Sequence, residues 1–305
     1  MQLDQIIIQA TNDRFTAVAL PLFVMAIMVE ALISYRQHRN LYVGKDFSVS
    51  LIMLVLSSLV DLLPKLVAFV TFVYLHELSP LRDVVQRQWW AWLALFFLDD
   101  FIYYWFHRAN HEVRLFWAGH VPHHSSVKLN FGTALRQGVG ERVHKYFFWV
   151  PLPLLGFDPL MIFTIISLNL IYQFWVHTEL VRKFHAVIEW LFNTPSHHRV
   201  HHASNIRYLD RNHAGVLIIW DRMFGTFSEE VDAEPVVYGL TKNINTFNPV
   251  AIAAREYLSL WRDINAAENP ADKLRYLFLA PGWHHNGEDC RSNVLRARGQ
   301  IKSMQ

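Results

Sequence analysis

One stretch of the sequence decides the fold: Trp89-Trp-Ala-Trp-Leu-Ala-Leu-Phe-Phe-Leu-Asp-Asp-Phe-Ile-Tyr-Tyr-Trp-Phe-His-Arg-Ala-Asn-His111. Its apolar part approaches the roughly 20 residues that a membrane helix needs, and the tryptophans at its start suit a membrane interface. The run ends in His107 and His111, which are four residues apart and therefore share one face of a helix. The segment predicts an apolar helix that delivers two imidazoles to one point.

Two further histidine motifs follow, His120-x2-His123-His124 and His198-x2-His201-His202, and 13 of the 17 histidines lie between residues 107 and 213. Imidazoles at this spacing can direct neutral nitrogens at one point, which is the geometry of metal ligands. Eight or more imidazoles exceed what one four- to six-coordinate ion needs, so we predict two metal ions. The predicted ligands are His107, His111, His120, His123, His124, His198, His201 and His202.

Composition limits the class of protein and the kind of metal site. The chain is 52% hydrophobic and 14% aromatic, which favours a membrane protein. A net charge of +2 without a basic run gives no support for nucleic-acid binding. Cys290 is the single cysteine, which excludes an internal disulfide and a thiolate-rich site, so nitrogen and oxygen must hold any metal.

Apolar segments predict an all-α fold, an integral membrane helical bundle with a histidine-rich cap. Residues 15–35 form a first span, and residues 1–14 lack the basic start of a cleaved signal peptide, so we expect this span to remain as an anchor. Residues 49–75 are interrupted by polar residues and proline, and we favour one kinked span over a pair of helices. Residues 146–176 predict two helices that enter and return.

Basic residues in the loop after the first span, Arg36, Arg39 and Lys45, place that loop and the histidine motifs on the cytoplasmic side. The membrane would be a bacterial inner membrane or the endoplasmic reticulum. We divide the chain into membrane anchor helices at residues 1–88, a catalytic domain at residues 89–228 and a cytoplasmic helical tail at residues 229–305. The apolar residues 214–227 are too short to span and are expected to cap the site or lie in the interface.

Three other residues are candidates for the site. Asp100 lies in line with the His107–His111 face, where its carboxylate would accept an imidazole N–H; solvation at a helix end is the alternative. Glu112 follows His111 directly, but a surface ion pair with Arg108 explains it equally well. His177 closes the returning helix and is predicted as a further ligand.

The remaining histidines and the local structure are less informative. Thr194 and Pro195 predict the start of a helix that carries the third motif, whereas Pro122 makes a regular helix less secure in the second. Isolated histidines, His213 among them, are interpreted as structural. We place a substrate pocket near Phe101, Trp105 and Trp175.

Neutral imidazole suits iron, zinc or copper, and a site beside apolar chains has most use for a metal that activates oxygen, which favours iron. Zinc-dependent lipid hydrolysis stays open on ligand type alone. A desaturase with the same ligands is an alternative. A metal transporter or sensor is a remote one, because transporters place polar ligands along the middle of their spans.

The motif series resembles the fatty acid hydroxylase and sterol desaturase superfamily, and within it the alkylglycerol monooxygenases are most similar. The resemblance rests on residues 100–112, 117–126, 133–137, 177–179, 193–202 and 215–226. It implies a di-iron enzyme that uses O2 to hydroxylate a membrane lipid, with the eight histidines of the motifs as ligands and Glu112 as a functional residue. For ether lipids it implies a hemiacetal product that breaks into an aldehyde and a glycerol derivative. The electron donor would be a reductant such as tetrahydrobiopterin or a redox protein.

Overall fold

The computed structural model describes residues 14–303, and this part of the chain is helical apart from loops and one isolated β-bridge between Ala203 and Tyr238. The predicted all-α class is confirmed. The helices are α2 (Arg14–Arg36), α3 (Gly44–Val60), α4 (Leu62–Leu78), α5 (Arg82–Val85), α6 (Trp89–Glu112), α7 (Arg114–His124), α8 (Phe131–Ala134), α9 (Arg142–Trp149), α10 (Pro151–Leu154), α11 (Pro159–Trp175), α12 (Ala186–Leu191), α13 (Pro195–His201), α14 (Ile219–Met223), α15 (Pro249–Ala266), α16 (Pro270–Phe278) and α17 (Ser292–Ser303).

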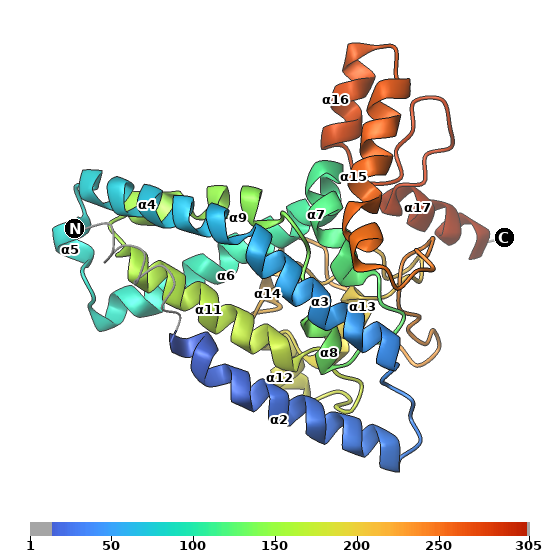
Figure 1. The fold of residues 1–305 in the computed structure, drawn as a ribbon, viewed down its shortest axis with the longest axis horizontal. Coiled ribbons are helices and arrows are strands. Elements are labelled where there is room, and N and C mark those ends of the chain that lie inside the picture. Colours follow the sequence, from blue (N-terminus) through green and yellow to red (C-terminus); the bar gives the residue numbers. More distant parts are fainter. Residues whose placement is uncertain (1–13, 304–305) are drawn as a thin grey trace.

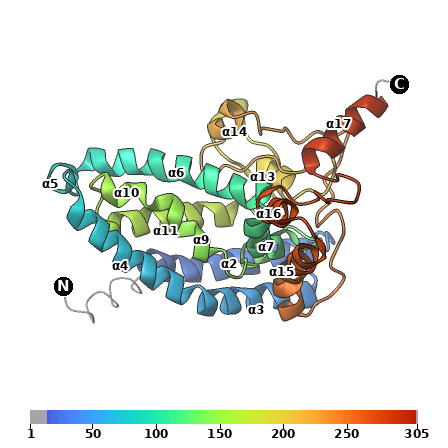
Figure 2. The same cartoon turned by 90° about the horizontal axis from the view of Figure 1, so that it is seen from above.

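The long helices α2, α3, α4, α6 and α11 run along the length of the molecule (Figure 1). Helices α15, α16 and α17 gather at the end opposite α5 in both views (Figures 1 and 2). The histidine-bearing helices α7 and α13 lie toward that same end, where α7 packs against both α6 and α15. The apolar helices and the C-terminal helices therefore meet around the histidine motifs.

The N-terminal helices carry a large exposed apolar surface. Within the described residues, the segment Val18–Arg36 is long and apolar enough to cross a membrane, and α3 with α4 meets that test only as one bent pair. Large side chains on these helices point outward, among them Leu22, Met28 and Leu63. Surfaces of this extent are unusual in soluble proteins, so they indicate association with a membrane.

Residues 49–75 form two helices instead of one continuous helix. Helices α3 and α4 meet at Asp61 with a bend of 44°. Asp61 is buried at this break and accepts a hydrogen bond from Arg142 Nη1 at 2.7 Å. The interruption therefore follows from a polar group that needs a partner, and whether the pair crosses a membrane as one span stays a prediction.

Residues 146–176 turn back as predicted, but the short helices α9 and α10 stand where one helix was expected, and whether this segment enters a membrane stays a prediction. Helices α9 and α10 lead to a turn at Gly156, which has φ of +87° and lies so close to the backbone of Leu81 that a Cβ would come within 2.7 Å of it. The return helix α11 begins with Pro159 at its first position, and the Asp158 side chain accepts from the Leu160 amide at 2.8 Å. Proline and a capping aspartate are typical of a helix start.

One apolar core fixes the direction of α6. Leu95 and Phe106 of α6 pack with Trp149 of α9, Leu152 of α10 and Ile162 of α11 in a single buried cluster. Because side chains three or four residues apart lie on one face of a helix, this packing also sets where His107 and His111 point. The core therefore positions the histidine end of α6.

Two buried polar contacts tie loops to the apolar helices. Glu30 of α2 accepts hydrogen bonds from the Tyr42 hydroxyl, the Phe131 amide at 2.7 Å and the Thr178 hydroxyl. Arg136 forms a buried ion pair with Asp46 of α3. The first contact holds the loop next to His177, and the second holds the chain segment that follows α8.

The C-terminal part of the chain is only partly the helical tail that we predicted. Residues 229–248 contain no helix, and α15, α16 and α17 follow them. Arg114 of α7 joins this part to the rest through ion pairs with Glu256 at 2.8 Å and Asp263 at 2.6 Å. Residues 214–227 form a buried loop with the short helix α14, which agrees with the expected cap.

Replacing Asp46 with alanine should lower the free energy of unfolding by about 3–5 kcal/mol, because the buried guanidinium of Arg136 loses its carboxylate. Denaturant unfolding in mild detergent measures this change. Glu229→Gln breaks the exposed Lys183–Glu229 pair and should change stability by less than about 1 kcal/mol. Equal effects of the two substitutions would contradict the prediction.

Candidate metal centre

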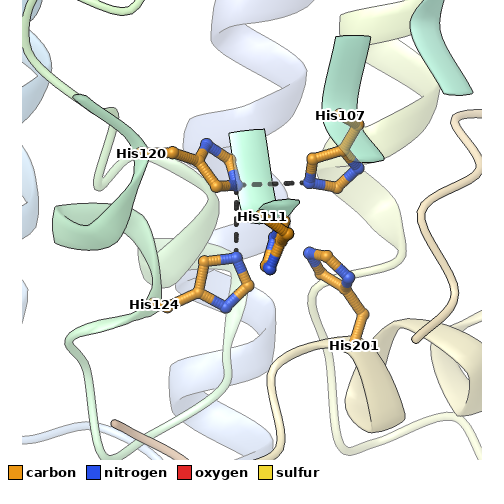
Figure 3. Close-up of side chains that lie close together, drawn as sticks. All are labelled: His107, His111, His120, His124 and His201. Carbon is orange, nitrogen blue, oxygen red and sulfur yellow. Dashed lines mark hydrogen bonds between the residues drawn. The ribbon is translucent and has the colours of Figure 1, made fainter. Parts of the chain in front are cut away.

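Nine buried histidines form two neighbouring groups. In each group the candidate ligand nitrogens lie within 4.8 Å of one another. The first cluster, drawn in Figure 3, is His107, His111, His120, His124 and His201. The second cluster is His123, His177, His198 and His202. The structure thus brings together all eight histidines of the three motifs, and it adds His177, which we had predicted from its place after α11.

Three helices and one loop supply these side chains. Helix α6 carries the first motif, α7 the second and α13 the third, with His202 as the residue that ends α13. Thr194 and Pro195 start α13 as predicted. The reservation about Pro122 was wrong, because it lies inside α7 in the last turn, where the helix continues through His124. A proline there removes one backbone hydrogen bond but does not end this helix.

The two H-x2-HH motifs divide their imidazoles between the clusters in opposite ways. His120 and His124 of α7 join the first cluster and His123 joins the second. In α13, His198 and His202 join the second cluster and His201 joins the first. Residues four apart differ by about 40° around a helix and residues three apart by about 60° in the other direction, so one short helix can serve two sites.

The Nε2 atoms of neighbouring imidazoles face one another at hydrogen-bond distance. In the first cluster, His120 Nε2 lies 3.2 Å from the Nε2 atoms of both His107 and His124 (Figure 3). In the second cluster, His177 Nε2 lies 2.9 Å from His198 Nε2 and 3.3 Å from His123 Nε2. A neutral imidazole has one lone pair and one N–H, so the lone pairs at these centres need a proton or a cation.

Outer hydrogen bonds fix the tautomers of several of these rings. Nδ1 of His107, His123, His177 and His201 each lies 2.7–3.0 Å from a backbone carbonyl oxygen, which can only accept. Nδ1–H must therefore donate, and Nε2 keeps a free lone pair that points into the cluster. Metal-bound histidines are oriented by outer partners in this way.

Burial keeps the imidazoles of His124, His198 and His202 neutral. Burial first, and then the neighbouring imidazoles, lower the pKa of His124, His198 and His202 well below the ordinary value. Neutral imidazole is the form that binds a metal.

The residues fit metal ions. His111 Nε2 and His201 Nε2 are buried and have no hydrogen-bond partner, although both belong to the first cluster. Unpaired buried nitrogens cost free energy unless something binds them, and a cation would pair with all of these lone pairs at once. Four or five nitrogen donors per cluster suit iron, zinc or copper.

Asp100 does not have the contacts that we expected. Its carboxylate accepts hydrogen bonds from the amides of Val216 and Leu217 at 2.7 and 2.9 Å and from Trp220 Nε1 at 2.9 Å. Both oxygens are therefore occupied by the loop before α14, so the prediction that Asp100 accepts an imidazole N–H was wrong. Its observed role is to hold that loop against α6.

Glu112 forms the surface ion pair that was the alternative interpretation. Its carboxylate lies 2.9 Å from Arg108 Nε, and its side chain is 47% exposed. Glu112 thus points away from both clusters' buried nitrogens. A functional role for Glu112 rests on the family resemblance alone.

Two carboxylates that sequence reasoning missed contact the first cluster. Glu141 Oε2 lies 3.3 Å from His120 Nδ1, and Asp210 Oδ1 lies 3.1 Å from His111 Nδ1. Burial would raise the pKa of Glu141, but His120, Lys145 and His144 together lower it to about 2, so the carboxylate is ionised. Neither residue stands at a helical spacing from a histidine motif, and no sequence signal marked them.

His213 is also nearer the site than we predicted. It is fully buried, and its ring centroid lies 5.0 Å from that of His111. Neither ring nitrogen has a hydrogen-bond partner, and its carbonyl oxygen accepts from His107 Nδ1. The one sequence feature that could have indicated this position is that His213 belongs to the 13 histidines gathered within residues 107–213.

Two cavities reach the clusters from different sides. The inner cavity, about 200 Å³, touches both clusters and is lined by residues of α2, α3, α6, α9 and α11. The outer cavity, about 530 Å³, touches His111, His124 and His201 and is otherwise lined mainly by residues 203–295. The centre is therefore approached from the apolar helices on one side and from the C-terminal helices on the other.

The predicted pocket residues lie elsewhere. Phe101 and Trp105 pack with each other and with Phe224, and Trp175 packs with Tyr172 and Phe184. None of the three lines the inner or the outer cavity. The prediction placed them by their position in sequence and did not account for the direction of each side chain around its helix.

The family model for fatty acid hydroxylases matches residues 92–226. The match includes all nine histidines of the two clusters. This segment is a fatty acid hydroxylase domain. The domain begins in α6 and ends after α14, so it contains the outer partners Glu141 and Asp210 as well.

Characterised relatives of the hydroxylase domain extend over most of the chain. The chain is 40% identical over 272 residues to alkylglycerol monooxygenase of Homo sapiens, covering 87% of this chain and 59% of that protein. It is 39% identical over 272 residues to alkylglycerol monooxygenase of Danio rerio, covering 88% and 60%. The chain thus spans about three fifths of the length of these relatives. No solved structure matches it.

Purified protein should hold two metal ions, one for each cluster. His111→Ala and His202→Ala should each reduce the content to one ion, because each removes a ligand from a different cluster. Elemental analysis measures the content. His144→Ala should keep both ions, since His144 is only partly buried and stacks on Phe116 outside the clusters. Loss of both ions in either ligand variant would contradict separate sites.

Glu141→Ala should weaken binding of the first ion by about 10–100-fold, because His120 loses an outer partner. Competition with a chelator measures the affinity. Glu112→Ala is the matched control and should bind metal like the parent protein, since Glu112 contacts Arg108. A larger loss of metal affinity in the Glu112 variant than in the Glu141 variant would contradict the role of Glu141 as the outer partner.

Proposed function

We propose that the chain is an integral membrane di-iron enzyme that uses O2 to hydroxylate the alkyl chain of a lipid. One observation carries the proposal: two buried all-histidine clusters lie against a cavity that is lined in part by the apolar helices α2, α3 and α11. The relatives named alkylglycerol monooxygenase support the same reaction class.

The choice of iron follows from the donors and the chemistry. Imidazole nitrogens bind iron, zinc and copper, but zinc has no redox chemistry and cannot activate oxygen. Iron held in the clusters would supply the oxidising power needed to attack an unactivated C–H bond. His107, His111, His120, His124 and His201 would hold one ion, and His123, His177, His198 and His202 the other.

The proposed reaction balances with one reductant. A C–H bond of the lipid becomes C–OH, and the new oxygen atom comes from O2. The other oxygen atom is reduced to water, and the reductant supplies two electrons for this while two protons are taken up. Relatives with the alkylglycerol name support an ether lipid as substrate. Hydroxylation next to the ether oxygen would give a hemiacetal, which separates into an aldehyde and a glycerol derivative.

The protein's part is to hold the substrate carbon near the clusters and to keep water away. The inner cavity touches His107 and His120 of the first cluster and His123, His177 and His198 of the second. A carbon bound there would lie beside both groups, and a positioned, dry substrate is what a reactive oxidant requires.

The outer cavity is proposed as the route for the electron donor. It meets the first cluster at His111, His124 and His201, which the inner cavity does not touch, and its walls include Lys242, Arg255 and Glu256. A polar reductant such as tetrahydrobiopterin, or a group of a redox protein, would find hydrogen-bonding partners there. Lipid and reductant would then reach the centre without sharing a path.

We also propose several passes through the membrane, with the metal centre on the cytoplasmic side. Arg36 ends α2, Arg39 lies in the loop that follows, and Lys45 lies in the first turn of α3; basic residues at this end of the helices favour the cytoplasm. Helices α2, α3, α4, α6 and α11 would lie within the bilayer. A bacterial inner membrane or the endoplasmic reticulum would suit this arrangement.

Iron-loaded protein in lipid vesicles, given O2 and a reductant, should add one oxygen atom from labelled O2 to an alkylglycerol. Mass spectrometry of the products measures this, and a loss of two hydrogens in its place would indicate a desaturase. His201→Ala should reduce the rate by at least about 100-fold, whereas His285→Ala on the C-terminal loop should not. Full activity of metal-free protein would refute the proposal.

A further inference from the structure

A buried lysine whose ammonium group forms no hydrogen bond with the described residues lines the inner cavity. Lys145 of α9 is 5% exposed and lines this cavity. Its Nζ lies 5.4 Å from the ring centres of Phe106 and Trp149, and among the described residues it takes part in no hydrogen bond or ion pair. An ammonium group has three hydrogen-bond donors. Its donors are therefore available to a molecule in the cavity.

The lining of the inner cavity has two chemically different parts. Phe23, Leu54, Leu170 and Ile171 come from the apolar helices α2, α3 and α11, and each is partly exposed. Gln137, Glu141 and Lys145 come from the segment around the start of α9. An amphiphilic molecule matches such a lining, with its tail among the helices and its polar group beside α9.

The size of the cavity limits how much of a lipid it holds. At about 200 Å³ it is smaller than the roughly 300–1,000 Å³ of pockets that enclose whole small ligands. One end of a lipid fits, and the rest must extend outward between the apolar helices. The polar part of the lining favours the head group as the end that enters.

The charges around Lys145 favour a neutral head group over an anionic one. Asp61 pairs with Arg142 at 2.7 Å, and Glu141 accepts hydrogen bonds from Asn110 and His120. Two carboxylates and two cations line this part of the cavity, so their formal charges cancel. A phosphate would lie against both carboxylates, whereas a hydroxyl group can accept from Lys145 and donate to Glu141.

We propose that Lys145 is a specificity residue that donates hydrogen bonds to the hydroxyl oxygens of a neutral lipid head group, which enters the inner cavity before the tail. The inference rests on the proposed function, since it assigns the substrate of the same centre. The carbons nearest the clusters are then those next to the head group. Oxidation takes place at the polar end of the alkyl chain and not at its terminal methyl group.

Binding can be measured without turnover, in iron-loaded protein kept free of O2 in nanodiscs. Three probes share a sixteen-carbon chain: 1-O-hexadecylglycerol, hexadecyl methyl ether and hexadecyl phosphate. Displacement of a fluorescent lipid gives each affinity. The parent protein should bind the glycerol ether at least tenfold more tightly than the methyl ether, because hydrogen bonds to a charged donor contribute differences of this order.

Lys145→Met, which keeps the length of the side chain, should lose most of this preference and leave the methyl ether affinity unchanged. Lys45→Met on the exposed face of α3 is the matched control and should retain the preference. Unchanged iron content and methyl ether binding would show that the Lys145 variant is folded, and Lys145→Arg should restore part of the preference.

The proposal would be overturned if a folded Lys145→Met protein preferred the glycerol ether over the methyl ether as strongly as the parent protein does. Tighter binding of hexadecyl phosphate than of the glycerol ether by the parent protein would also overturn it. Head-group discrimination that depends on Lys145 in a protein without oxygenase activity would refute the proposed function alone. Oxygenase activity without an effect of Lys145 would refute this inference alone.

Discussion

Nine imidazoles enclosed in one buried region are the constraint on which the rest of the structure depends. Backbone carbonyls of distant segments fix the rings of His107, His123 and His201 so that their Nε2 lone pairs face inward. Such an arrangement is unfavourable by itself, because the lone pairs repel one another and some buried nitrogens, such as Nε2 of His111 and His201, have no hydrogen-bond partner. It becomes favourable with cations in the clusters, and the surrounding helices are arranged to keep the rings in place until then.

The parts of this site that could be predicted are those that obey a helical period. His107 with His111, and the members of each H-x2-HH motif, lie on one side of a helix, so their convergence follows from spacing alone. Glu141 and Asp210 reach the site through loops, and no period marks them. Asp100 has the correct spacing for a contact with the histidines, but its side chain bonds to backbone amides of residues 216 and 217, more than a hundred residues away. Long-range partners of this kind cannot be read from local spacing.

The fold was predictable in the same sense. Runs of apolar residues predicted the long helices, and the prolines together with Gly156 predicted the turn between α10 and α11. The break between α3 and α4 depends on Asp61, whose partner Arg142 lies 81 residues further along the chain. Residues of the C-terminal helices line the outer cavity, and their amino-acid composition did not predict this role. Their contact with α7 through Arg114 makes them part of the centre's surroundings.

The opposite division of imidazoles by α7 and α13 has a consequence for the assembly of the protein in the cell. Neither cluster contains its full set of nitrogens until His198, His201 and His202 have been synthesised and α13 has docked against α7. A nascent chain that ends before α13 therefore offers only partial coordination to a metal ion. A metal ion held in either cluster would cross-link the early and late halves of the domain.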